Sequence, residues 1–310
     1  MNTVQILIIN SSQGGPVNKT CQIGQLVSRQ LITQQLVLQD KIRFTQFFVK
    51  RALYKDKRIQ LLNQATCRFT QHCTERQQTF LIISGDHSCA MGSWAGVLNA
   101  LHPQQRLGLL WLDAHLDAHT YVSSPSGNCH GMPIAALLGL ADPKLKRFYP
   151  SARHLRSGHL ILLGARSYEA AELRLLNHAS VEVIHAHQID NFKQSFLSAY
   201  RRLAQSCTHI GISLDLDLVD PTDAPAVATP VADGITAIEL LEALRSIQGD
   251  NQWCGLECAE FIPHADYKNR TLKLLLEIMQ IYSAHSATLS KPNRFLGLAS
   301  SGIIRHSVPS

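Results

Sequence analysis

The chain has 310 residues, with 29 Lys and Arg against 23 Asp and Glu, a formal net charge of +6 and a hydrophobic fraction of 45%. These values are typical of a globular protein with a sizeable core. The basic residues are scattered and form no run, so they do not predict a nucleic-acid-binding surface. We expect a cytoplasmic protein with no membrane partner, because no apolar stretch approaches the length of a membrane span and no leader pattern opens the sequence. The eight cysteines form no CxxC pair, which predicts reduced thiols.

Short apolar runs alternate with helical patterns along the chain. The predicted strands are Val4–Ile9, Phe47–Val49, Thr79–Ser84, Leu107–Leu112, Leu160–Leu163, Val181–Ile184, His209–Leu214 and Trp253–Glu257. The predicted helices are Ile23–Gln34, Arg58–Arg76, Ser88–Ala100, Met132–Leu140, Glu169–Asn177, Phe192–Ala204, Ala237–Ser246 and Arg270–His285. This alternation predicts β/α units around a parallel sheet that is buried on both faces. No repeat or long linker interrupts the pattern, so we expect a single domain.

Acid and imidazole side chains follow four of the predicted strands. They lie in Ser84-Gly-Asp-His-Ser88, Asp113-Ala-His-Leu-Asp117, Asp215-Leu-Asp217 and at Glu260. Ligands in open α/β sheets bind at the carboxyl ends of the strands. We therefore expect these four segments to meet on one edge of the sheet, an arrangement that packing alone does not explain.

Two of these segments carry ligand-type side chains in alternation. In an extended backbone, residues i, i+2 and i+4 point to the same side, so Asp113, His115 and Asp117 could converge, as could Asp215 and Asp217. Four carboxylates held together would repel one another unless cations lay between them. The pattern predicts a metal site, and two metals suit this number of anionic ligands.

Each residue taken alone has a simpler interpretation. A single Asp after a strand is usually a helix cap, which is the expected role of Asp86 before Ser88. A single His is more often a satisfied core or surface group than a ligand. The metal prediction therefore depends on the residues occurring together.

Taken together with His87, these residues make the chain similar to the arginase, or ureohydrolase, family. The matching segments lie in the family's order between residues 84 and 263, and are Ser84-Gly-Asp-His-Ser88, Asp113-Ala-His-Leu-Asp117, Ser126-Gly-Asn-Cys-His-Gly-Met-Pro133, Ser213-Leu-Asp-Leu-Asp-Leu-Val-Asp-Pro221, Ala224-Pro-Ala-Val-Ala-Thr-Pro230 and Glu260-Phe-Ile-Pro263. The resemblance implies one arginase-like catalytic domain over residues 1–310. Its fold would be a three-layer α/β/α arrangement with a mostly parallel sheet of about eight strands.

The resemblance also implies two Mn(2+) ions per chain. The implied ligands are His87, Asp113, Asp117 and Asp215 around one or other metal, with His115 and Asp217 completing the pair. Carboxylate oxygens with a little imidazole suit Mn(II). Two metals roughly 3.5–4 Å apart can share a water and lower its pKa. The expected nucleophile is thus a bridging hydroxide that attacks the guanidinium carbon, with Asp117 accepting its hydrogen bond.

Three further residues acquire roles from the resemblance. His130 matches a histidine that serves proton transfer beside the metals. Glu260 matches a carboxylate that fixes the substrate guanidinium, a task that suits a charge-assisted bidentate pair. Thr229 is expected to contact the same region. The alternatives are a loop histidine without a role and, for Thr229, a turn former before Pro230.

The amino-acid end of the substrate would be recognised by a separate set of residues. Ser126 and Asn128 match loop positions near the substrate carboxylate, and Glu169 matches an acid for the α-amino group. Glu169 could equally be an acid in the first turn of a helix. His119 is a departure, because many arginases carry Asn there; a His can still donate a hydrogen bond to a carboxylate. Ile262 is a second departure, in place of a common Asn.

We therefore expect a hydrolase that converts L-arginine to L-ornithine and urea. Another ureohydrolase activity, such as that of an agmatinase, guanidinobutyrase or formimidoylglutamase, remains the first alternative. A non-catalytic metal-binding member of the family is the second, although retention of both His130 and Glu260 speaks against it. Members of the family are often trimers or hexamers, so we expect a homo-oligomer.

Overall fold

The computed structural model describes residues 4–16, 23–33, 42–47 and 53–289. Within these residues, eight strands form one sheet in the order β2-β1-β3-β8-β7-β4-β5-β6, and every neighbouring pair is parallel. The strands are β1 (Val4–Ile9), β2 (Ile42–Phe47), β3 (Phe80–Ser84), β4 (Leu107–Leu112), β5 (Leu160–Ala165), β6 (Glu182–His185), β7 (His209–Asp215) and β8 (Trp253–Ala259). The predicted α/β class with a parallel sheet is confirmed.

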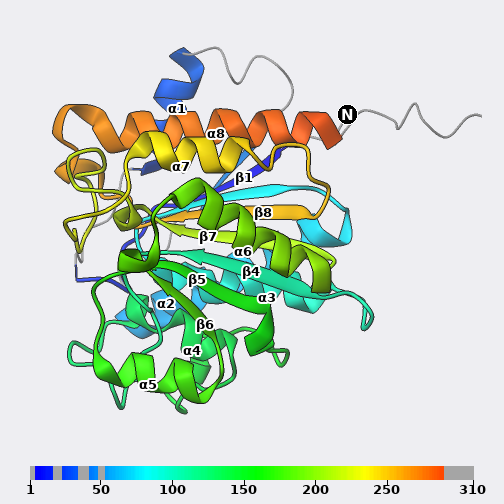
Figure 1. The fold of residues 1–310 in the computed structure, drawn as a ribbon, viewed down its shortest axis with the longest axis vertical. Coiled ribbons are helices and arrows are strands. Elements are labelled where there is room, and N and C mark those ends of the chain that lie inside the picture. Colours follow the sequence, from blue (N-terminus) through cyan, green and yellow to red (C-terminus); the bar gives the residue numbers. More distant parts are fainter. Residues whose placement is uncertain (1–3, 17–22, 34–41, 48–52, 290–310) are drawn as a thin grey trace, which may run out of the picture.

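Helices cover both faces of this sheet (Figure 1). One layer contains α1 (Ile23–Thr33), α6 (Phe192–Ser206), α7 (Ala237–Arg245) and α8 (Arg270–Leu289). The other contains α2 (Lys55–Glu75), α3 (Ala90–Ala100), α4 (Pro133–Leu137) and α5 (Ala170–His178). In the view of Figure 1, α6, α7 and α8 lie in front of the sheet, and α2 and α3 lie behind it. The predicted three-layer arrangement is therefore confirmed.

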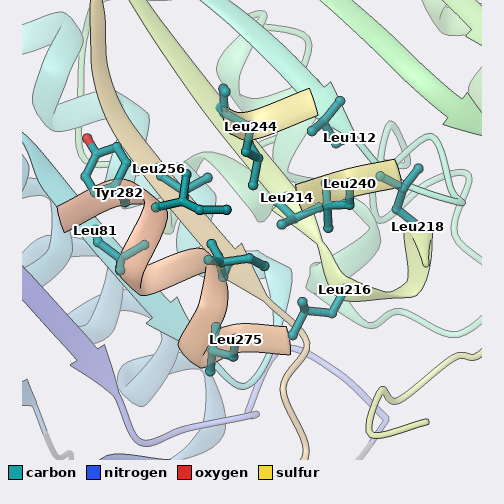
Figure 2. Packing of buried hydrophobic residues seen from close by; sticks show 14 of the residues in the cluster. Leu81, Leu112, Leu214, Leu216, Leu218, Leu240, Leu244, Leu256, Leu275 and Tyr282 are labelled. Carbon is teal, nitrogen blue, oxygen red and sulfur yellow. The ribbon is translucent and has the colours of Figure 1, made fainter. Parts of the chain in front are cut away.

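The two-sided burial explains the nearly continuous apolar runs in the sequence. On β4, Leu110 and Leu112 belong to the core beneath α7 and α8, whereas Leu109 and Trp111 belong to the core beneath α2 and α3. Figure 2 shows leucines of the first core packed between the strands and the helices α7 and α8. Each fully buried Leu contributes roughly 1.5–3 kcal/mol relative to an exposed one. Side chains on both faces must therefore be apolar.

The edge strand β2 was placed wrongly by the sequence pattern. The predicted strand Phe47–Val49 shares only Phe47 with the observed strand Ile42–Phe47, and Phe48 and Val49 lie outside the described residues. Arg43, Thr45 and Gln46 are exposed in β2, because an edge strand has a neighbour on one side only. Such a strand lacks the apolar run by which the central strands were recognised.

Two helices also differ from their predicted bounds. The predicted helix Ser88–Ala100 begins with a 3₁₀ turn at His87–Cys89 before α3 starts at Ala90. The predicted helix Met132–Leu140 contains only the short α4. Gln34, the predicted end of the first helix, lies outside the described residues. None of the helices described is long and apolar enough to cross a membrane.

His285 on α8 is a buried histidine that lies outside the four polar segments at the strand ends. It is 0% exposed. Its Nδ1 accepts a hydrogen bond from the Gly249 N–H at 3.1 Å, and its Nε2 lies 2.9 Å from the carbonyl oxygen of Trp253. These partners require a neutral ring with its proton on Nε2. Burial lowers the pKa of His285 below its ordinary value.

Acidification is expected to weaken the fold through His285. The unfolded imidazole takes a proton near pH ~6.5, whereas the folded one does so at lower pH, so the unfolded state binds more protons as the pH falls. The contribution of His285 is thus complete above about pH 6.5 and is lost as the pH falls towards the folded pKa. His285→Gln should lower the free energy of unfolding at pH 7.5 by about 1–3 kcal/mol and flatten its decline towards pH 5. Urea denaturation at both pH values measures this, with exposed His178→Gln as the control; parallel pH profiles in wild type and His285→Gln would contradict it.

Candidate metal centre and adjoining cavity

The four polar segments follow the four central strands of the sheet. β3, β8, β7 and β4 are neighbours in that order, and all are parallel. His87 follows β3, Glu260 follows β8, Asp215 is the last residue of β7, and Asp113 follows β4. The sheet order therefore brings together residues that lie far apart in the sequence.

One group of four side chains surrounds His87. Its Nδ1 lies 3.3 Å from Asp113 Oδ2, 3.0 Å from Asp117 Oδ2 and 3.2 Å from Asp215 Oδ2. All four residues are buried, and their ligand atoms lie within 4.8 Å of one another. One imidazole nitrogen facing three carboxylate oxygens is the donor set of a metal site with mixed oxygen and nitrogen ligands.

A second group shares Asp113 with the first. Asp113, His115 and Asp217 also offer ligand atoms within 4.8 Å of one another. His115 Nδ1 lies 3.0 Å from Asp217 Oδ2 and 3.6 Å from Asp113 Oδ1. Because Asp113 belongs to both groups, two cations held there would be close neighbours.

The predicted geometry of these motifs was partly wrong. Asp113, His115 and Asp117 do not point to one side of an extended strand, because β4 ends at Leu112 and Asp117 has a positive φ of 46°. Asp215 and Asp217 likewise belong to different groups, since a 3₁₀ turn follows β7. The loop after β4 thus divides its ligands between the two groups.

The two ligand groups together form a cluster of acids and histidines. Among the described residues, no Lys or Arg forms an ion pair with its carboxylates. The ion pairs of its carboxylates are with His87 and His115 only. Burial and the charge of Asp113 raise the pKa of Asp117 to about 6, and burial with the charge of Asp217 raises that of Asp215 well above its usual value. Burial of carboxylates costs free energy that a cation between them offsets.

Two buried atoms at the centre of the cluster have no hydrogen-bond partner among the described residues. These atoms are His87 Nδ1 and Asp117 Oδ2, which lie 3.0 Å apart as an ion pair without forming a hydrogen bond. A buried polar atom without a partner costs roughly 1–3 kcal/mol. Both atoms face other ligand-type atoms at about the spacing that one coordinated ion would impose. The residues present therefore fit a divalent cation in each group.

A polar network behind the cluster fixes the ring of His87. Its Nε2 lies 3.0 Å from Ser213 Oγ, and that hydroxyl donates to Glu257 Oε2 at 3.2 Å. Trp111 stacks on the ring with centroids 4.3 Å apart, and its indole N–H donates to Asp113 Oδ2. This network leaves Nδ1 turned towards the carboxylates, as second partners of metal-binding histidines do.

Asp86 lies beside the cluster but has a different role. Its Oδ1 accepts from the Ser88 N–H at 3.0 Å, and its Oδ2 accepts from the Gly14 N–H at 3.0 Å. It is the N-cap of the 3₁₀ turn that carries His87. The cap interpretation of Asp86 is confirmed.

A cavity of about 220 Å³ opens above the cluster. Residues of the predicted site that line it are His115, Asp117, His119, Ser126, Asn128, His130, Glu169, Asp215 and Thr229. His87, Asp113, Asp217 and Glu260 do not line it, and all four are buried. Acids predominate over cations in this lining, which suits a cationic ligand.

His130 and Glu260 form a pair beside the cavity. His130 Nδ1 lies 3.0 Å from Glu260 Oε1, which also accepts from the His87 N–H at 3.1 Å. Although burial opposes protonation, the hydrogen bond to Glu260 helps to raise the pKa of His130 to about 9. Glu260 Oε2 is buried and has no hydrogen-bond partner among the described residues. One oxygen of Glu260 is thus unpartnered, although this residue does not itself line the cavity.

His119 lines the cavity, and both of its ring nitrogens contact other side chains. Its Nε2 lies 3.0 Å from Glu169 Oε2 and 3.4 Å from Glu172 Oε2, and its Nδ1 lies 3.1 Å from Ser123 Oγ. The hydrogen bond from His119 lowers the pKa of Glu169. Both ring nitrogens of His119 therefore have protein partners, and a direct contact with a substrate carboxylate would require one of them to be released.

Thr229 and Glu169 both line the cavity and also have contacts in the local structure. Thr229 lines the cavity, and its hydroxyl lies 3.4 Å from Asp217 Oδ2. Glu169 lines the cavity as well, and it is the N-cap residue of α5. For both residues, a position in the local backbone structure is compatible with a contact to a ligand.

Sequence reasoning missed several residues that support the site. Glu172 accepts from the N–H groups of Ala118 and Glu169, and it stands one helical turn from Glu169. Ser213 and Glu257 are polar residues inside otherwise apolar strands, and this was the available signal for a buried polar network.

Arg166 was also missed, and it holds two loops next to the cluster. Its guanidinium donates to four backbone carbonyls, at distances of 2.7 to 3.2 Å, which are those of Asp217, Leu218, Val231 and Ala232. One of these loops carries Asp217 and the other follows Thr229. No local pattern in the sequence indicates such a contact.

Comparisons with known proteins agree on one family. The sequence model described as Arginase family matches residues 23–283. The arginase of Bacillus caldovelox is 33% identical over 219 residues, which cover 70% of this chain and 72% of the relative. The crystal structure of arginase from Bacillus subtilis subsp. subtilis str. 168 superposes with a TM-score of 0.80 and 26% identity, covering 94% of this chain and 99% of that one. The formimidoylglutamase of the same organism superposes with a TM-score of 0.75 at 18% identity, over 94% of this chain and 88% of that one, so it shares the fold.

Proposed function

Because the chain belongs to the arginase family of hydrolases, we propose that it cleaves L-arginine to L-ornithine and urea. The observation that carries this proposal is the acid-lined cavity, whose lining includes members of both ligand groups together with Ser126, Asn128 and Glu169. A guanidinium cation suits the acids of the ligand groups, and the polar groups of an amino acid suit the other three residues.

We assign two Mn(2+) ions to the two groups. His87, Asp113, Asp117 and Asp215 would hold one ion, and Asp113, His115 and Asp217 the other. Hard oxygen donors with one imidazole per group favour Mn(II) over softer metals. When bound, two such cations would lower the pKa of a water molecule and supply a nucleophile at neutral pH.

Glu260 and His130 would act on the substrate beside these ions. The unpartnered Glu260 Oε2 would accept a hydrogen bond from the guanidinium and orient its carbon. His130 Nδ1 is engaged with Glu260, so Nε2 is the atom that would transfer a proton to the departing amine of ornithine. The C–N bond to that amine breaks, and urea and ornithine leave. Thr229 would support the second ligand group through Asp217.

A second set of residues around the cavity would recognise the amino-acid part. Glu169 and Glu172 are suited to the α-amino group, and Ser126 and Asn128 offer donors to the carboxylate. His119 would act mainly by holding Glu169 in its ionised form. Agmatine lacks the carboxylate, so these contacts favour arginine over agmatine.

A substrate panel with Mn(II)-loaded protein tests the proposal. Arginine, agmatine, guanidinobutyrate and formimidoylglutamate would be compared, with urea and formamide as the measured products. We expect the highest kcat/KM with arginine and equal amounts of ornithine and urea. Hydrolysis of another compound but not of arginine would replace arginase with that activity. Bound metal without hydrolysis of any compound would favour a non-catalytic member.

A further inference from the structure

Lys55 is a cation that the site described so far does not use. It is the first residue of α2, and its side chain is partly buried. Its Nζ donates a hydrogen bond to Asn128 Oδ1 at 3.3 Å, across 73 residues of sequence. Asn128 in turn lines the cavity, and its N–H donates to Ser126 Oγ at 3.2 Å. The ammonium group therefore lies beside the loop to which we assign recognition of the substrate carboxylate.

The acids around the cavity make the positive charge of Lys55 important for the binding of an anionic group. Of the acids that line the cavity, Asp117 and Asp215 belong to the first ligand group, which leaves Glu169 and Glu172 to face a substrate, and among the described lining residues there is no Lys or Arg. These carboxylates attract a guanidinium or an amino group but repel the carboxylate of an amino acid. A carboxylate-bearing substrate needs a compensating positive charge near its carboxylate, and Lys55 lies beside Asn128, which we assign to that group.

The hydrogen bond also orients the amide of Asn128. Lys55 has donors only, so it must engage the amide oxygen of Asn128. The NH₂ group of Asn128 is then left as the donor for another partner. A carboxylate accepts hydrogen bonds and cannot donate them when ionised. Lys55 thus favours the amide orientation that a substrate carboxylate requires.

From these contacts we infer that Lys55 determines specificity for guanidino substrates that carry an α-carboxylate. It does so by placing a positive charge beside Asn128 and by orienting that amide. The inference rests on the proposed arginine hydrolysis and adds the residue that separates arginine from its decarboxylated analogue, agmatine. Lys55 contacts a residue assigned to the substrate carboxylate, so it should affect substrate binding more than the chemical step.

The test compares Lys55→Gln with Lys57→Gln. Lys57 belongs to the same helical turn, but it is exposed and donates to Gln60 Oε1 at 3.0 Å, so it is the matched control. Lys55→Gln should lower kcat/KM for arginine about tenfold, mainly through KM, as expected for one charge-assisted contact. It should not lower kcat/KM for agmatine. Lys57→Gln should change neither substrate, and Lys55→Arg should restore most of the preference.

A binding measurement separates this inference from the proposed reaction. By calorimetry, Lys55→Gln should weaken the binding of L-ornithine about tenfold and leave that of 1,4-diaminobutane unchanged. If wild type releases no urea from arginine, the proposed reaction fails, and the ornithine comparison still decides the role of Lys55. Equal effects on both ligands would show that Lys55 only stabilises α2. That result, no effect on either ligand, or no ornithine binding by wild type would overturn the inference.

Discussion

Asp113→Asn is expected to remove both cations and to lower turnover by at least about a thousandfold, because two-metal catalysis supplies several kcal/mol of transition-state stabilisation. Asp113 is the residue that the two ligand groups share. Its Oδ2 accepts a hydrogen bond from the Trp111 indole N–H and its Oδ1 accepts one from the His115 N–H, so the amide of Asn can keep only one of these two bonds and a lower unfolding midpoint is also expected. Metal content per chain after gel filtration and the initial rate with arginine measure the two effects.

Asp86→Asn is the matched control for this substitution. Asp86 is equally buried and lies next to His87, but its oxygens accept from Gly14 and Ser88 and it belongs to neither ligand group. We expect Asp86→Asn to lower the thermal unfolding midpoint and to keep both cations. If Asp113→Asn retained two cations per chain with normal turnover, the assignment of Asp113 as a shared ligand would be wrong.

Glu260→Gln is expected to lower kcat/KM for arginine about a hundredfold or more. The substitution removes the negative charge that would face the guanidinium, and a buried charge-assisted pair is worth roughly 3 kcal/mol. Gln can still accept the His87 N–H through its amide oxygen, so the backbone around the cluster should be retained. Steady-state kinetics over a range of arginine concentrations gives the loss.

Two further measurements show that this loss arises at the substrate. The metal content and unfolding midpoint of Glu260→Gln should stay close to those of wild type. Glu277→Gln, which removes an exposed carboxylate on α8, should leave kcat/KM unchanged because exposed ion pairs such as Arg245–Glu277 contribute little. A fall in metal content parallel to the fall in activity would argue instead that Glu260 acts through His87.

The central part of the fold could be predicted because its signals are local. Leu107–Leu112 is apolar at every position except Gly108, as a strand buried on both faces must be, and the structure has β4 at these residues. The edge strand β2 lacks that signal, since exposed Arg43 and Thr45 resemble a loop in composition. Local patterns therefore predict strands that keep an apolar pattern, including the other edge strand β6 to within one residue, and they fail for β2, which lacks one.

The candidate site was also predictable only in part. The residue types in Asp113-Ala-His-Leu-Asp117 indicate a cation site, because so many acids at one strand end need compensation. How they are shared between two groups depends on the positive φ of Asp117 and on the turn after β7. An alternating pattern cannot encode either feature.

The sequence alone determined the class of fold, the edge of the sheet where the chemistry lies, and the kinds of ligand that meet there. These properties follow from side-chain periodicity and from the rule that parallel strands end on one edge. Only the tertiary structure decided that His119 faces Glu169 and that Lys55 reaches Asn128. These contacts join segments that lie 50 and 73 residues apart in the sequence. The packing of helices against the sheet decides which residues meet, and short-range sequence patterns carry no information about that packing.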